Sequence, residues 1–266
     1  MRFFYLVFLF FSISIFSQIK MNNLFSDNMI LQRNSKVNIW GKSNPNQIVT
    51  VYSSWNNKSE KTKSNRDGDW ILKIQTDSSV GPYELSISTS DDTKIIKNIL
   101  FGEVWFASGQ SNMEMPLDGF FGEPVFGAQD IIGKSINPQI RLITVERNYS
   151  STPLLNFSGK WEESNPESSR YFSAVAYSFA KYIHESLELP VGIISSAWGG
   201  TPAEAWAEKN FLDDEFEPGI IINNSEEKYE EYNPGYLFNA MLNPLIPFTV
   251  RGGIWYQGEN NRERAK

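Results

Sequence analysis

A serine in a glycine-flanked turn is the residue of this chain best placed for nucleophilic chemistry. Ser111 stands in the run Trp-Phe-Ala-Ser-Gly-Gln-Ser-Asn-Met at residues 105–113, where an apolar, strand-like stretch gives way to glycine and small polar residues. A turn of this kind presents a serine hydroxyl to a substrate. A serine nucleophile also needs a base, and the sequence holds a single histidine, His184, in the middle of an apparent amphipathic helix. The sequence therefore predicts a nucleophile without an obvious base.

Two further polar clusters hold other groups that acyl transfer requires. Such a transfer needs a nucleophile, a base, an acid that orients the base, and donors for the oxyanion. Gly199 and Gly200 form a turn whose backbone can approach a substrate closely. The cluster at residues 257–261 offers three side-chain amides and one carboxylate: Gln257, Asn260, Asn261 and Glu259. Glu259 could orient a histidine, or it could instead cap a helix or pair with Arg262.

Each of these three clusters follows a predicted strand. The strands are the apolar runs at residues 99–106, 191–195 and 252–256, and a helix over Ser173–Leu187, followed by Pro190, leads into the second strand. Ligands of open α/β sheets bind outside the carboxyl ends of the strands. We therefore expect one site at one sheet edge. Because the helix precedes its strand, His184 is expected at the surface near the opposite edge.

The amino-terminal part of the chain has a different pattern. Four alternating runs typical of antiparallel strands, at residues 37–40, 48–52, 70–74 and 83–87, are separated by turn-forming segments. This spacing predicts a small all-β sandwich. We therefore divide the chain into a signal peptide at residues 1–17, a β-sandwich domain at 18–98 and an α/β domain at 99–266.

Composition limits the partners and the compartment. Met1-Arg2 and the apolar run from Phe3 to Phe16 are typical of a secretory signal, which predicts a secreted or periplasmic protein beginning near Gln18. A membrane anchor is the alternative, but the run is shorter than the roughly 20 residues that span a bilayer, so no membrane partner is expected after cleavage. The net charge of −7 argues against nucleic acid, and the absence of cysteine excludes disulfides and thiolate metal sites.

The three clusters together resemble the blocks of a known family. Gly-Gln-Ser-Asn-Met at 109–113, Trp-Gly-Gly-Thr at 198–201 and Trp-Tyr-Gln-Gly-Glu-Asn-Asn at 255–261 are similar, in order, to those of the sialate O-acetylesterases, part of the SGNH hydrolase superfamily. The similarity spans roughly Leu24 to Asn261. No G-x-S-x-G elbow is present, which disfavours an ordinary α/β-hydrolase.

The resemblance implies a fold, a reaction and residue roles. It implies an SGNH-type, flavodoxin-like parallel-sheet domain that removes O-acetyl groups from carbohydrates, most of all sialic acid, by a serine mechanism without metal or other cofactor. Ser111 matches the nucleophile and Gly200, or less surely Gly199, the oxyanion glycine. One alignment of the third block makes Asn260 the second donor. The other, which we favour, makes it Gln257 or Asn261, with Glu259 supporting the triad.

One expected block is absent, and two alternatives stay open. Family members carry an Asp-x-x-His or Asp-x-His block that is not found before Lys266. We therefore expect the chain to be truncated and its 266 residues to have little or no esterase activity. A different acetylated polysaccharide, such as xylan, is an alternative substrate. A carbohydrate-binding protein without catalysis is an alternative function. The oligomeric state is not set by any feature of the sequence.

Overall fold

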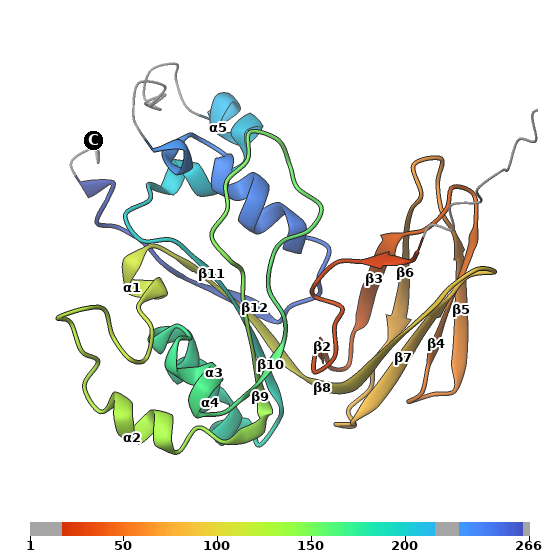
Figure 1. Cartoon of the computed structure of the whole chain (residues 1–266), viewed down its shortest axis with the longest axis horizontal. Helices are drawn as coiled ribbons and strands as arrows, with labels where there is room; N and C mark the ends of the chain where they lie inside the picture. The colour runs from red at the N-terminus through yellow and green to blue at the C-terminus, as the bar shows by residue number, and fades with distance from the viewer. Residues whose placement is uncertain (1–17, 216–228, 263–266) are drawn as a thin grey trace, which may run out of the picture.

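The computed structural model describes residues 18–215 and 229–262, and the predicted signal peptide lies outside them. The amino-terminal half contains eight strands (Figure 1): β1 (Lys20–Met21), β2 (Ile30–Gln32), β3 (Lys36–Lys42), β4 (Ile48–Ser53), β5 (Lys58–Lys63), β6 (Asp69–Gln75), β7 (Tyr83–Ser88) and β8 (Thr93–Gly109). The four alternating runs predicted from the sequence lie in β3, β4, β6 and β7. Those four strand predictions are therefore confirmed.

The rest of the described chain contains both helices and strands. They are α1 (Ser111–Glu114), α2 (Ala128–Gly133), β9 (Asn137–Thr144), β10 (Glu162–Ser164), α3 (Pro166–Arg170), α4 (Ala174–Leu187), β11 (Val191–Ala197), η1 (Ala203–Trp206), α5 (Lys209–Glu215), η2 (Glu230–Tyr232), η3 (Phe238–Leu242), η4 (Asn243–Leu245) and β12 (Gly252–Tyr256). None of the helices in the described ranges is both long and apolar enough to cross a bilayer.

The long strand β8 joins the two halves. Among the described residues, β1, β3 and β6 form a small antiparallel sheet, and the other nine strands form a mixed sheet in the order β10-β9-β11-β8-β7-β4-β5, with β2 and β12 also paired to β8. The first part of β8 pairs antiparallel with β7, and its last part pairs parallel with β11 and β12. The chain is therefore not interrupted at the boundary predicted at Asn98.

A local irregularity turns β8 from one half to the other. Asn98 has a φ of 56°, a left-handed conformation that asparagine tolerates better than most residues. The register between β7 and β8 also shifts between Tyr83 and Leu85. Such a bulge bends a strand and increases its twist. Asn98 thus marks a bend inside a strand rather than a linker.

The parallel part of the sheet is covered on both faces. β11 is buried along its whole length, as expected for a central parallel strand. Ile193 packs with Ala176 and Tyr177 of α4 on one face, whereas Ile194 belongs to the core that contains Trp206 and Met241 on the other. The predicted helix is confirmed: Ser173 caps it by accepting a hydrogen bond from the Ala176 N–H, and it ends at Leu187. These layers fix the carboxyl ends of the strands.

Candidate active site

The three polar clusters lie at one edge of the sheet because their strands are parallel and in register. Gly109, the last residue of β8, is opposite both Ala197 of β11 and Tyr256 of β12. Each cluster begins within two residues of these strand ends. The sequence prediction that the three strands deliver their loops to one place is therefore confirmed. In Figure 1 this edge is the one that carries α1.

Ser111 is held in a tight turn between β8 and α1. Gly109 has a φ of 142°, and a side chain there would clash with the carbonyl oxygen of Tyr256. The Gln110 N–H donates to that same oxygen at 3.1 Å. Ser111 is then the first residue of α1, so its N–H precedes the intrahelical hydrogen bonds. Its half-buried hydroxyl makes no hydrogen bond to any residue in the described ranges, and is thus available to a substrate or base.

Glu259 holds the residues on both sides of Ser111. One carboxylate oxygen accepts from the Gln110 side-chain amide at 2.5 Å, and the other accepts from the Asn112 amide at 2.7 Å. The side-chain oxygen of Gln110 in turn accepts from the Asn260 backbone N–H at 3.4 Å. The structure thus connects the third cluster to the serine turn. A carboxylate oxygen can accept more than one bond, so these contacts leave room for a base.

Glu114 and Arg147 hold the glycine turn, a feature that the sequence analysis missed. One carboxylate oxygen of Glu114 accepts from the Gly199 N–H at 2.7 Å, and the other pairs with the Arg147 guanidinium at 2.6 Å. The same guanidinium lies 5.4 Å from the ring centroid of Trp198, which favours a cation–π contact. The hydrogen bond to Glu114 raises the pKa of Arg147 above its ordinary value. The Gly199 N–H is therefore already used in a hydrogen bond, and the Gly200 N–H is the other candidate oxyanion donor of this turn.

The three candidate amide donors of the third cluster are all engaged with the protein. The Gln257 amide donates to the Thr201 carbonyl at 2.9 Å, and the Asn260 amide donates to the Gly200 carbonyl. Asn261 is bonded at both ends: its oxygen accepts from the Ala203 N–H and its amide donates to Glu204, each at 2.8 Å. These bonds attach the third cluster to the loop that follows β11. They place the three amides along residues 200–204 without selecting one as the donor.

His184 is far from Ser111. The amino end of α4 lies at α1, because the Ala174 N–H donates to the Met115 carbonyl at 2.8 Å. His184 comes ten residues later, about 15 Å along the helix at 1.5 Å per residue. Its ring bonds the Leu189 carbonyl at 2.7 Å, just before β11 begins opposite Glu103, at the other end of the stretch in which β8 pairs with β11. The expected position near the opposite sheet edge is confirmed, although the side chain is half-buried.

A small cavity lies beside the end of α1. It has a volume of about 260 Å³ and is lined by Glu114 of α1, by Phe120 and Tyr171, by Arg147 from the segment after β9, and by Ser195 and Ala197 of β11. Aromatic rings beside charged and hydroxyl groups are common in sites that bind polar ligands. The structure thus offers a recess beside Glu114, in the helix that begins at Ser111.

Comparison with known proteins identifies the relatives of this chain. The family described as a carbohydrate esterase, sialic acid-specific acetylesterase, matches residues 102–266. The chain belongs to this family. The match covers the α/β part, from β8 through the three clusters that surround Ser111.

Relatives of this esterase family extend the similarity into the amino-terminal strands. The sialate O-acetylesterases of Homo sapiens and Pongo abelii are each 28% identical over 256 residues, which cover 89% of this chain and 48% of the relative. The crystal structure of a carbohydrate acetylesterase from Xanthomonas citri matches with a TM-score of 0.81 and 31% identity, covering 91% of this chain and 52% of that one. The chain thus spans about half the length of these relatives.

Proposed function

We propose that this protein is a serine esterase that removes O-acetyl groups from carbohydrates. The observation that carries the proposal is the arrangement at Ser111: an unbonded hydroxyl at the end of β8, beside the Gly199-Gly200 turn, in a chain of the acetylesterase family. The Cα and Cβ of Ser111 lie 3.4 and 3.2 Å from the position a Gly199 Cβ would occupy. The names of the relatives, which are sialate and carbohydrate acetylesterases, support the same reaction class.

In the proposed mechanism the Ser111 oxygen attacks the acetyl carbonyl. The sugar oxygen leaves with a proton, an acetyl-serine forms, and water then releases acetate and restores the serine. The oxyanion is stabilised by the backbone N–H groups of Ser111 and Gly200, since the Gly199 N–H is already bonded to Glu114. Gln257 or Asn261 is the additional donor, because each side-chain amide donates one N–H to the protein, to Thr201 and to Glu204 respectively, and keeps a second N–H.

Glu259 has two compatible roles in this proposal. It holds Gln110 and Asn112, and thereby the serine turn, and it can also orient a base, as the sequence resemblance implies. The base is not His184, because that ring lies near the far end of α4. Ser111 therefore has no histidine within hydrogen-bonding reach, roughly 2.6–3.2 Å, among these 266 residues.

We also propose a substrate and a cellular compartment for this protein. We propose O-acetylated sialic acid as the substrate, on the names of the curated relatives, and acetylated xylan as the alternative. An SGNH-type domain from residue 99 onward, preceded by a β-sandwich at residues 18–98 and exported by the signal at residues 1–17, completes the proposed organisation. Secretion or a periplasmic location would be supported by a mature amino terminus near Gln18, and an intact Met1 would contradict it.

The substrate test compares acetate release from two esters. The protein as its host makes it is incubated with 9-O-acetylated sialic acid and with acetylated xylan, beside a Ser111→Ala variant. Faster release from the sialic acid ester, lost in the variant, is expected. Faster acetate release from acetylated xylan would instead support a plant polysaccharide as the substrate.

A carbohydrate-binding protein without catalysis is the second candidate. The distance of His184 from Ser111 favours it, because a serine without a base is a poor nucleophile. The same Ser111→Ala variant separates the two candidates. Sugar binding that is unchanged by the substitution, with no acetate release by either form of the host-made protein, would favour binding alone.

A further inference from the structure

A second and larger cavity lies away from Ser111, between the small sheet and two later segments of the chain. It has a volume of about 620 Å³, which is within the range of small-molecule sites. One wall is made by β1, β3, β6 and the end of β5, and the other by residues 155–156 and 243–247. In Figure 1 these strands lie on the opposite side of the molecule from α1.

The walls of this cavity are fixed by buried contacts. The Asn22 side-chain amide donates to the carbonyl oxygens of Leu155 and Pro244 at 3.0 and 2.9 Å, and Asn22 is only 4% exposed. The Trp40 ring packs edge-on against the Phe25 ring, with 4.5 Å between the ring centroids. Because both sides of the cavity are held by such contacts, it is formed before any ligand binds.

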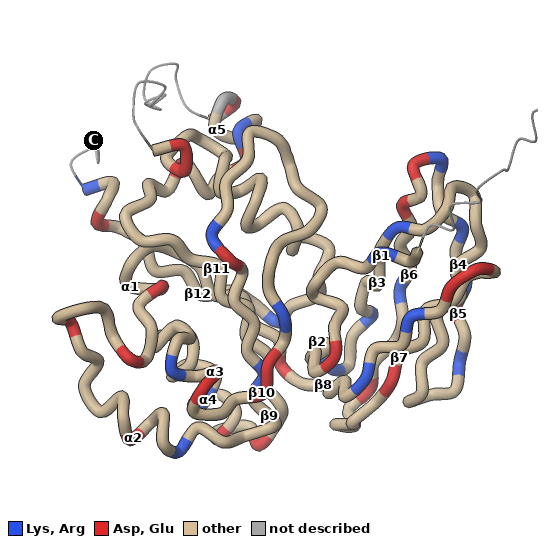
Figure 2. The backbone as a smooth tube through the Cα atoms, viewed as in Figure 1, with Lys and Arg blue, Asp and Glu red and all other residues tan. Residues whose placement is uncertain are grey.

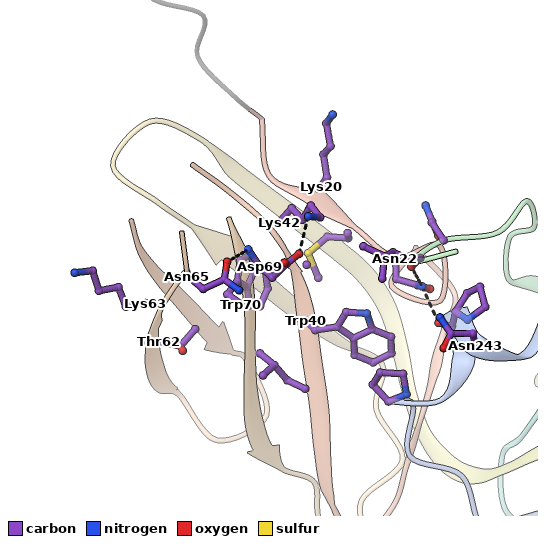
Figure 3. A pocket seen from close by; sticks show the side chains of 17 residues that line it. Lys20, Asn22, Trp40, Lys42, Thr62, Lys63, Asn65, Asp69, Trp70 and Asn243 are labelled. Atoms are coloured by element: carbon purple, nitrogen blue, oxygen red, sulfur yellow. Dashed lines mark hydrogen bonds and ion pairs between the residues drawn. The ribbon is translucent and has the colours of Figure 1, made fainter. Parts of the chain in front are cut away.

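The lining suits a carbohydrate. Figure 3 shows the Trp40 ring extending from β3 toward the segment that carries Asn243. The polar side chains of Asn65 and Asp69 lie on the other side of Trp40, just before and at the start of β6. Flat aromatic surface combined with amide and carboxylate groups matches the apolar faces and hydroxyl groups of a sugar.

The charge of the lining favours an acidic ligand. Three lysines and one aspartate line the cavity, and Lys42 pairs with Asp69 at 2.8 Å. Lys20 and Lys63 lie at the rim (Figure 3) and have no carboxylate partner in the described ranges. Figure 2 shows the same concentration of blue near β1 and β3. A positive cavity in a chain of net charge −7 is best explained by an anionic ligand.

We propose that this cavity binds a sugar that carries a carboxylate group. Its ring lies against Trp40, and its carboxylate is held by Lys20 and Lys63, whose long, flexible side chains extend outward in Figure 3 and turn toward the ligand when it binds. This binding is independent of the reaction proposed at Ser111. It gives the protein a second contact with acidic glycans.

Calorimetry with N-acetylneuraminic acid tests the proposal, with the methyl ester of the same sugar as the uncharged probe. The double variant Lys20→Glu, Lys63→Glu removes both rim cations from exposed positions, so the fold should be kept. We expect saturable binding of the acid that is weakened about tenfold or more by the double variant. The ester should bind about tenfold more weakly than the acid.

The matched control is Lys58→Glu, Lys61→Glu. These lysines are exposed on β5, the strand of Lys63, but do not line the cavity, and the change in net charge is the same. The control should bind within about twofold of the original protein. Equal weakening in both double variants would overturn the proposal, as would equal binding of acid and ester or no saturable binding below about 10 mM. Acetate release is a separate readout, so failure here leaves the Ser111 proposal unaffected.

Discussion

At the scale of single residues, two glutamates hold the two turns of the site, Glu259 the serine turn and Glu114 the glycine turn. Glu259 bonds the amides on either side of Ser111, and Glu114 bonds the Gly199 N–H while pairing with Arg147. Both act through hydrogen bonds to charged acceptors, which are stronger than those between neutral groups. Oxyanion donors must be held in place before a reaction, and these carboxylates bond the neighbours of Ser111 and Gly200, the two donors we propose.

Replacing Glu259 should loosen the serine turn. Glu259→Ala removes two hydrogen bonds at an exposed site, so we expect a loss of about 1 kcal/mol in unfolding free energy, or about 2–4 °C in Tm. Amide hydrogen exchange at residues 110–112 should become faster. Glu60→Ala, an exposed glutamate on β5, is the control and should leave both unchanged. Unchanged exchange at 110–112 in Glu259→Ala would show that these bonds do not hold the turn.

At the scale of elements, the site depends on the register of three parallel strands. Gly109, Ala197 and Tyr256 lie side by side, so the loops that follow them meet at one edge. Gly109 is essential to this arrangement, because the Gln110 N–H reaches the Tyr256 carbonyl only when no side chain intervenes at position 109. Gly109 thus allows the serine turn to form a hydrogen bond with the end of β12.

Adding a methyl group at Gly109 should disrupt this edge. Gly109→Ala places a Cβ against the Tyr256 carbonyl and strains a φ of 142°, so we expect a loss of about 2–4 kcal/mol in denaturant unfolding. Gly253→Ala is a matched control on β12, since the nearest atoms to its Cβ would be at 3.6 Å. It should cost about 1 kcal/mol or less. Equal losses in the two variants would contradict this explanation.

Much of this arrangement was predictable from the sequence. Apolar runs predicted the strands that became β11 and β12, and spacing with Pro190 predicted α4. The Glu114–Arg147 pair was missed, because its residues are 33 apart and meet only after β9 joins the sheet. The boundary was predicted at Asn98 because the pattern of the sequence changes there, whereas Asn98 lies inside the continuous strand β8 and its positive φ bends that strand. Local patterns predict elements, but pairing between distant segments decides side-chain contacts.

At the scale of the whole molecule, the two halves share a strand and a core. β8 pairs with β7 in one half and with β11 in the other, and one core cluster contains residues from both, such as Ile39 and Ile194. Asn22 adds polar contacts between β1 and the segments at residues 155 and 244. The halves are therefore expected to unfold together rather than as independent units.

Removing the Asn22 side chain should weaken the whole molecule. Asn22→Ala leaves two carbonyls without their donor and the Leu24 N–H without its acceptor, so we expect a loss of about 2–4 kcal/mol in a single unfolding transition. The exposed Asn148, whose side chain bonds only its neighbour Tyr149 among the described residues, provides the control Asn148→Ala. Two separate transitions in the original protein would show that the halves are independent.

The 266 residues by themselves should show little or no esterase activity. Their one histidine lies near the far end of α4, so Ser111 lacks a base. Added imidazole should raise acetate release from an acetyl ester, and the increase should be lost in Ser111→Ala. Robust release without imidazole that depends on Ser111 would contradict this prediction.

The most direct test of the proposed chemistry is acetate release from 9-O-acetylated sialic acid by the protein as its host makes it, with and without Ser111→Ala. If Ser111 is the nucleophile, the substitution should lower turnover by about 10³-fold or more while the fold is kept. A variant that releases acetate at the original rate would contradict the assignment of Ser111 as the nucleophile.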